Sequence, residues 1–124
     1  MKKLLAVTAI LGLTAITPTA SAHHSNAMFD MSREVNMRGV VREFQWTNPH
    51  AYIQLVVTDE NGEEVEWSME MGAPMYLYAR GWRPRTLRPG TEIQVRANPL
   101  RSGDPGGVVV DVVDAEGNEI GTNQ

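Results

Sequence analysis

Residues 51–71, AYIQLVVTDENGEEVEWSMEM, predict a β-hairpin. Between Val65 and Met71 every second side chain is apolar, which is typical of a strand with one buried face. Residues 51–58 form the preceding strand, and Asn61-Gly62 accommodates the positive φ angles of a tight turn between the two. The opposite face of the second strand, which we expect to be solvated, carries Glu64, Glu66, Ser68 and Glu70.

Further elements flank this hairpin on both sides. In the first strand, Gly39 marks a bulge or a bend. The segment Thr47-Asn48-Pro49-His50 is a turn, because Asn-Pro starts turns and proline donates no backbone hydrogen bond. The expected elements are strands over residues 34–46, 51–58, 63–71, 91–97 and 108–113, with a helix over residues 73–80.

The order β-β-β-α-β-β predicts an all-β fold, a five-stranded OB-like barrel with one short helix. We expect the first three strands to pair as a meander, with the first strand also closing against the last strands. The alternative is a small immunoglobulin-like sandwich, but such a sandwich usually has about seven strands and no helix.

The first 22 residues have the three parts of a secretory signal peptide. Lys2 and Lys3 form a positive segment, an apolar run follows over residues 4–13, and Ala20-Ser21-Ala22 supplies the cleavage site. The apolar run is too short to span a bilayer core of about 30 Å. We therefore expect an exported protein, periplasmic or secreted, that begins at His23 and has no membrane span after cleavage.

Composition narrows the possible functions of the mature chain. The protein has no cysteine, so disulfides and thiol catalysis are excluded. The formal charge of −4 argues against nucleic acid as a partner. Both lysines lie in the signal peptide, which excludes Schiff-base chemistry after cleavage. The mature chain divides into an extended arm (residues 23–33), a single barrel domain (residues 34–120) and a tail (residues 121–124).

Several motifs resemble a family of small exported bacterial proteins, the family numbered 6152 among domains of unknown function. One departure is Thr91, where that pattern has an acidic residue after the glycine. The resemblance implies a periplasmic β-rich domain over residues 23–113 and implies no particular activity. The motifs are HHS and FD after the signal peptide, GVVREFQWTNPHAYIQLVVTDENG, EWSME, ARGW and LRPG.

Three histidines, His23, His24 and His50, are candidate metal ligands. After cleavage, His23 carries an α-amine beside its own imidazole, and these two nitrogens together with His50 suit Cu(II). The alternative is that the histidine pair is a polar chain end without a ligand role. Met69 and Met71 share the buried face with Trp67, so we expect them in the core and not as thioether ligands.

The loops between strands one and two and between strands four and five flank the ligand face of an OB barrel. In this chain the first loop carries Trp46, Asn48 and His50, and the second loop carries Arg101 and Asp104. We expect Arg101 and Asp104 to approach His50 and form a small polar ligand site. The alternative is that Asn48 and His50 only satisfy the backbone of their turn while Trp46 caps the core.

Four arginines, Arg80, Arg83, Arg85 and Arg88, cluster near Trp82. Arginines beside a tryptophan can bind an anion or a sugar acid through forked hydrogen bonds and stacking. The alternative is a solvated loop whose arginines pair with the acidic face of residues 63–71.

No nucleotide-binding, hydrolase or metalloprotease motif is present in the sequence. We expect a non-enzymatic binding or accessory domain whose partner is a small ligand or an envelope protein. The alternatives are a periplasmic copper-binding protein, a structural module docked on an envelope protein, and, last, an acid–base enzyme built on His50.

Overall fold

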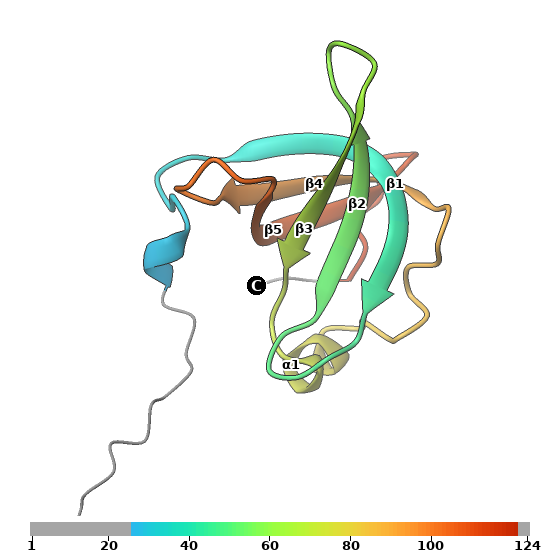
Figure 1. The fold of residues 1–124 in the computed structure, drawn as a ribbon. Coiled ribbons are helices and arrows are strands. Elements are labelled where there is room, and N and C mark those ends of the chain that lie inside the picture. Colours follow the sequence, from blue (N-terminus) through green and yellow to red (C-terminus); the bar gives the residue numbers. More distant parts are fainter. Residues whose placement is uncertain (1–25, 122–124) are drawn as a thin grey trace, which may run out of the picture.

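Five strands close into a barrel, and one helix covers an end of it (Figure 1). The computed structural model describes residues 26–121, so the expected signal peptide, His23, His24 and residues 122–124 lie outside the described residues. No helix among the described residues is long and apolar enough to cross a membrane. The elements are η1 (Asn26–Met28), β1 (Val35–Gln45), β2 (Tyr52–Thr58), β3 (Glu64–Glu70), α1 (Pro74–Ala79), β4 (Glu92–Pro99) and β5 (Gly106–Asp114).

The strands follow the order β1-β2-β3-β5-β4 around the barrel, and β4 pairs back to β1. All pairs are antiparallel except β3 with β5, which are parallel. This arrangement confirms the predicted barrel, the meander of the first three strands and the closure of the first strand against the later ones. The sandwich alternative is wrong, because a single sheet closes on itself.

Strand β1 belongs to both halves of the barrel and is strongly curved (Figure 1). Its first half pairs with β4 and its second half with β2. Gly39 lies where β1 changes partner, and a Cβ atom there would lie 2.5 Å from the Val56 carbonyl oxygen. The register shift itself falls later, between Val41 and Glu43. Gly39 therefore permits a close approach of two strands, and the bulge is a separate feature.

Trp82 lies in the core, although it belongs to the arginine-rich loop after α1. Its side chain is completely buried, and its ring lies 5.8 Å from that of Phe44. Gly121 passes so close to the indole that any side chain at that position would collide with it. The proposal that Trp82 stacks on a bound anion is therefore wrong, because barrel and C-terminal residues cover the ring. The other fully buried large side chains are Val41, Ile53, Leu55, Met69, Leu77, Ile93, Val95 and Val112.

Strand β3 has the predicted register. Met69 and Met71 are buried, and Trp67 packs partly buried against the same cluster. On the opposite face Glu64 and Glu66 are exposed. The two methionines are therefore core residues, as predicted.

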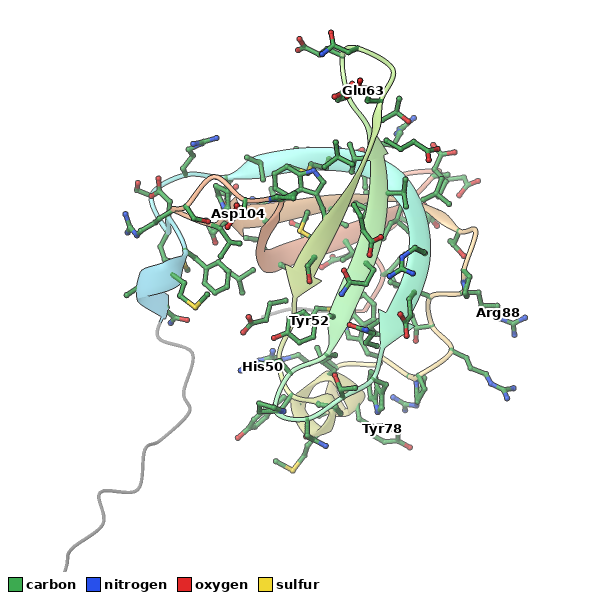
Figure 2. The ribbon with its side chains drawn as sticks, viewed as in Figure 1. His50, Tyr52, Glu63, Tyr78, Arg88 and Asp104 are labelled. Carbon is green, nitrogen blue, oxygen red and sulfur yellow. The ribbon has the colours of Figure 1, made fainter. Side chains whose placement is uncertain are left out.

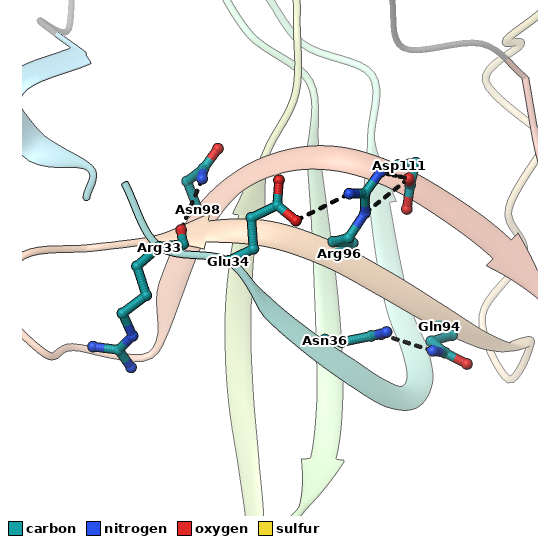
Figure 3. Close-up of polar contacts among 7 residues, drawn as sticks. All are labelled: Arg33, Glu34, Asn36, Gln94, Arg96, Asn98 and Asp111. Carbon is teal, nitrogen blue, oxygen red and sulfur yellow. Dashed lines mark hydrogen bonds and ion pairs between the residues drawn. The ribbon is translucent and has the colours of Figure 1, made fainter. Parts of the chain in front are cut away.

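Polar side chains join β1, β4 and β5 at the barrel seam (Figure 3). Arg96 Nε donates to Asp111 Oδ2 at 2.9 Å, and Arg96 Nη1 donates to Glu34 Oε2 at 3.0 Å. The hydrogen bonds to Asp111, followed by the bond to Glu34, raise the pKa of Arg96 above its usual range. Beside them the buried Asn98 donates from Nδ2 to the carbonyl oxygen of Arg33 at 2.8 Å.

The described part of the N-terminal arm is not simply extended. Residues Asn26–Met28 form a 3₁₀ turn, and Phe29 then makes an antiparallel bridge with Leu100. The Phe29 side chain is 3% exposed. The Asp30 amide donates to the Pro99 carbonyl oxygen at 2.8 Å. This segment therefore packs as an additional part of the barrel.

Candidate functional site

A small cleft of about 180 Å³ lies where the arm meets the outer face of β2 and β3. It lies on the strand 2–3 face of the barrel, beside the loop between β4 and β5. OB barrels bind their ligands on this face. The residues that line the cleft are Met28, Phe29, Tyr52, Ser68, Glu70, Leu100 and Gly107.

Glu70 is the charged residue of this cleft, and its side chain is only 12% exposed. Strand alternation predicts Glu70 on the solvated face, and for this residue that expectation is wrong. Met28, Phe29 and Leu100 line the same cleft as this carboxylate, of which little is reached by water. Burying a carboxylate is costly unless it is paired or hydrogen-bonded.

His50 is held beside Glu70 by the backbone after β3. Its Nδ1 lies 3.0 Å from the carbonyl oxygen of Met71. A carbonyl oxygen can only accept, so Nδ1 carries the proton in this contact. The other ring nitrogen, Nε2, lies 3.5 Å from Glu70 Oε1. Nε2 therefore either donates as an imidazolium or presents its lone pair toward a carboxylate.

Tyr52 approaches Glu70 from the neighbouring strand, since these two residues are register partners in the β2–β3 pair. Its hydroxyl donates to Glu70 Oε2 at a distance of 3.5 Å. Burial raises the pKa of Tyr52, and the nearby charge of Glu70 raises it further. Figure 2 shows Tyr52 and His50 close together below the hairpin.

These three side chains place one carboxylate between a phenol and an imidazole, at the edge of an apolar cleft. Such an arrangement suits a ligand with a positive or hydrogen-bond-donating group and a small apolar body. Among residues 26–121 no group of three or more His, Asp or Glu side chains could hold a metal ion. His50 and Glu70 would supply only two ligands to such an ion.

The other residues predicted at this site do not join the cleft. Trp46 is partly buried and packs edge-on against Phe44 at 5.7 Å, as expected of a residue that caps the core. The loop contains a cis Asn48–Pro49 bond, and Asn48 is exposed. Thr47 Oγ1 donates to the His50 carbonyl oxygen at 2.7 Å, so Thr47 rather than Asn48 closes this turn.

Arg101 was expected near His50, but it binds the arm instead. Its Nε donates to the Ala27 carbonyl oxygen at 3.1 Å, and its amide donates to the Met28 carbonyl oxygen at 2.9 Å. Asp104, from the same loop, lies far from His50 (Figure 2). Asp104 therefore does not approach His50 as expected, and the Nε of Arg101 is used by the arm, which lies along this loop.

A second, larger hollow of about 440 Å³ lies on the outside of β1 and β2, near Pro89 and Gly90. It is open to solvent, and Arg42 on its wall is paired with Glu66 at 2.8 Å. This hollow has no buried charged group, so the smaller cleft is the better candidate for a ligand site.

Sequence reasoning identified His50 but missed Glu70 and Tyr52. Both belong to regular strands, and their pattern indicates only that they point away from the core. What distinguishes them from other outward-facing residues is that they pair with each other across β2 and β3, next to the His50 turn. This pairing can be recognised only when the register of the hairpin is known.

No curated protein and no solved structure matches this chain. A family model does match, over residues 10–110, and its description is a family of unknown function (DUF6152). The matched segment covers most of the sequence, including β1, β2, β3 and α1. The chain therefore belongs to the family DUF6152.

Proposed function

We propose that this protein is an exported, non-enzymatic binding module that holds a small ligand in the cleft between the arm and the β2–β3 face. The observation that carries the proposal is Glu70, a carboxylate with 12% exposure at the edge of an apolar cleft. Tyr52 and His50 offset part of the free-energy cost of burying this charge, and a positive ligand group would offset more of it.

The cleft also limits the size of the ligand. Its volume of about 180 Å³ corresponds to about six water molecules. Met28, Phe29 and Leu100 line it with apolar atoms, while Glu70 and Tyr52 supply polar atoms. A short alkyl ammonium group fits this combination of size, apolar walls and charge.

An NMR titration with n-butylammonium tests this proposal, with 1-butanol as a neutral probe of similar size. We expect the ammonium probe to shift backbone amide signals of the cleft residues, and butanol to shift them much less. The variant Glu70→Gln is expected to lose this difference, whereas Glu66→Gln, on the exposed part of the same strand, keeps it. Equal responses to the two probes, or an unaffected Glu70→Gln, would contradict the proposal.

The exported location rests on the signal peptide features of residues 1–22. The mature protein is expected to begin at His23, after Ala20-Ser21-Ala22. Intact-mass measurement of protein recovered from the periplasm or the medium tests this directly. A mass that retains residues 1–22, or a start several residues away, would contradict it.

A second candidate function is copper binding, and the orientation of His50 favours it. Because Nδ1 donates to the Met71 carbonyl oxygen, a metal ion would bind His50 at Nε2, which lies 3.5 Å from Glu70 Oε1. After cleavage, the predicted N-terminal residue His23 would supply its α-amine and imidazole as the other two nitrogens of the site.

Cu(II) titration of three proteins tests this second candidate: the native start at His23, a version with one extra residue before His23, and His50→Ala. We expect tight binding only by the first, because the extra residue removes the amine–imidazole chelate and preserves every side chain. Binding should weaken as pH falls, since the α-amine titrates near about 7.7–8.0. Equal affinity of the extended protein would disprove the N-terminal copper site.

A further inference from the structure

The end of the barrel that carries α1 has an exposed surface of apolar, aromatic and basic residues. On the short helix, Met75 is 69% exposed, Tyr76 59% and Tyr78 58%. Large side chains of this kind are normally covered, and a group of them marks an interaction surface. We call this surface the basic end, and it consists of Met75, Tyr76, Tyr78, Arg80, Arg83 and Arg85.

Charge is distributed unevenly along the molecule. Residues 71–91 contain four arginines and no acidic residue, although the whole chain has a formal charge of −4. The β2–β3 hairpin has the opposite composition, since residues 59–66 contain five acidic residues and no basic one. Figure 2 shows Glu63 on this hairpin and Tyr78 on α1 at opposite ends of the barrel. An anionic surface therefore attracts one end of the molecule and repels the other.

The arginines of the basic end differ in how they are held. The Arg83 guanidinium lies over the Tyr78 ring at 3.6 Å and donates to the Tyr78 and Trp82 carbonyl oxygens. This contact fixes the exposed ring and the charge relative to each other. The Arg85 side chain is exposed and makes no hydrogen bond or ion pair with another described residue. Its guanidinium is thus available to an external anion.

We propose that the basic end docks on the surface of an anionic phospholipid bilayer. Tyrosine is favoured at membrane interfaces, where its ring contacts acyl chains and its hydroxyl remains in water. Arginines beside it bind lipid phosphates through forked hydrogen bonds. Because α1 is at the outermost end of the barrel (Figure 1), Met75 and the two tyrosines can enter the headgroup layer. The acidic hairpin then points away from the membrane.

A bilayer fits this end better than an extended nucleic acid does. The basic end has aliphatic and phenolic side chains on one short helix, and such side chains insert into lipid. The remaining surface is acidic, so a long polyanion that follows the barrel would meet repulsion beyond the loop of residues 80–91. Docking does not depend on what the cleft binds, since no residue of the basic end lines it.

Vesicle sedimentation with the mature protein tests the proposal. The vesicles contain phosphatidylglycerol and phosphatidylcholine, or phosphatidylcholine alone. Each basic residue near an anionic surface strengthens binding about fivefold, so the double variant Arg80→Gln/Arg85→Gln should bind about 25-fold more weakly. The matched control, Arg33→Gln/Arg38→Gln, changes the net charge equally and should bind like the unmodified protein.

A second measurement examines insertion directly. In the variant Tyr76→Trp, we expect tryptophan emission to shift to shorter wavelength on anionic vesicles and to be quenched by brominated lipid. Equal weakening by both double variants would overturn the proposal, because it would show an effect of net charge alone. Binding to single-stranded oligonucleotides without binding to anionic vesicles would also overturn it and would assign the basic end to a polymeric anion.

Discussion

At the scale of single residues, three polar side chains are linked by contacts with one another or with the backbone: Glu70, Tyr52 and His50. Each of these side chains has a polar group with a partner, and the partners lie on β2, on β3 and in the backbone after β3. Glu70 contacts both other side chains, because Tyr52 and His50 approach its two oxygens. Changes at Glu70 should therefore be detectable at the other two residues.

The ionisation of Tyr52 tests this coupling. Its pKa is raised by burial and by Glu70, so in the folded protein Tyr52 should lose its proton at a higher pH than the usual 10.0. The unfolded chain loses that proton first, and the free energy of unfolding therefore falls as pH rises above about 10. Ultraviolet absorbance of tyrosinate measures the titration.

In Glu70→Gln, the late-titrating component should move toward lower pH, because the neighbouring negative charge has gone. Tyr52→Phe should remove this component altogether and identifies it. A titration curve that is the same in Glu70→Gln and in the unmodified protein would contradict the contact between the two side chains.

Gly39 is a single residue on which the approach of β1 to β2 depends. An alanine Cβ there would meet the Val56 carbonyl oxygen at 2.5 Å and Leu55 Cγ at 2.8 Å, so the two strands must separate. Gly39→Ala is expected to lower the free energy of unfolding by about 1–3 kcal/mol, a typical cost of overpacking. Urea unfolding measures it, and Arg38→Ala, an exposed neighbour, should change little.

At the scale of secondary-structure elements, alternation determines which face of β3 is inward, but not how deeply each residue is buried. Val65 and Trp67, toward the hairpin, are partly buried, whereas Met69 and Met71, toward α1, are buried. The same gradient appears on the outer face, where Glu64 is exposed and Glu70 is nearly buried. Residues of β3 are therefore more deeply buried the closer they lie to α1.

The two tryptophans Trp67 and Trp82 should therefore differ in their contribution to stability. Trp82→Ala is expected to lower the free energy of unfolding by about 3–5 kcal/mol, because it empties a fully enclosed site. Trp67→Ala should cost about 1–3 kcal/mol, since water already reaches part of its ring. Chemical unfolding of both variants checks the order. If Trp67→Ala cost as much as Trp82→Ala, the gradient along β3 would be wrong.

At the scale of the whole molecule, closure depends on segments far apart in the sequence. Arg96 connects β4 with Glu34 and Asp111, and the arm lies along the loop between β4 and β5. Where β5 begins beside β4, a Cβ at Gly107 would lie 2.7 Å from the Asn98 carbonyl oxygen. From these contacts we expect the arm, the last strand and the cleft to unfold as one cooperative unit.

Phe29→Ala tests whether the arm is part of this unit. The side chain is 3% exposed, and its removal should lower the free energy of unfolding by about 3 kcal/mol. We also expect the amide of Asp30, which donates to Pro99, to exchange its hydrogen much faster. The control Met31→Ala changes an exposed side chain and should have neither effect. If the Asp30 amide exchanged its hydrogen at the same rate in Phe29→Ala and in Met31→Ala, the arm would not be part of this unit.

The sequence by itself determined the elements, their order and the inward face of β3, and the barrel followed from that order. These features depend on neighbouring residues: a period of two side chains, an Asn-Gly turn and a proline at the start of a helix. The position of His50 in the turn between β1 and β2 also followed, since that turn is local.

Only the tertiary structure decided which outward-facing residues are covered. Glu70 shares its cleft with residues 28, 29 and 100, which lie at least 30 positions away from it along the chain. Phe44 and Gly121 pack against Trp82, and the Arg101 side chain donates a hydrogen bond to the Ala27 carbonyl oxygen. A periodic pattern reports the direction in which a side chain points, whereas its burial depends on which distant segment packs over it.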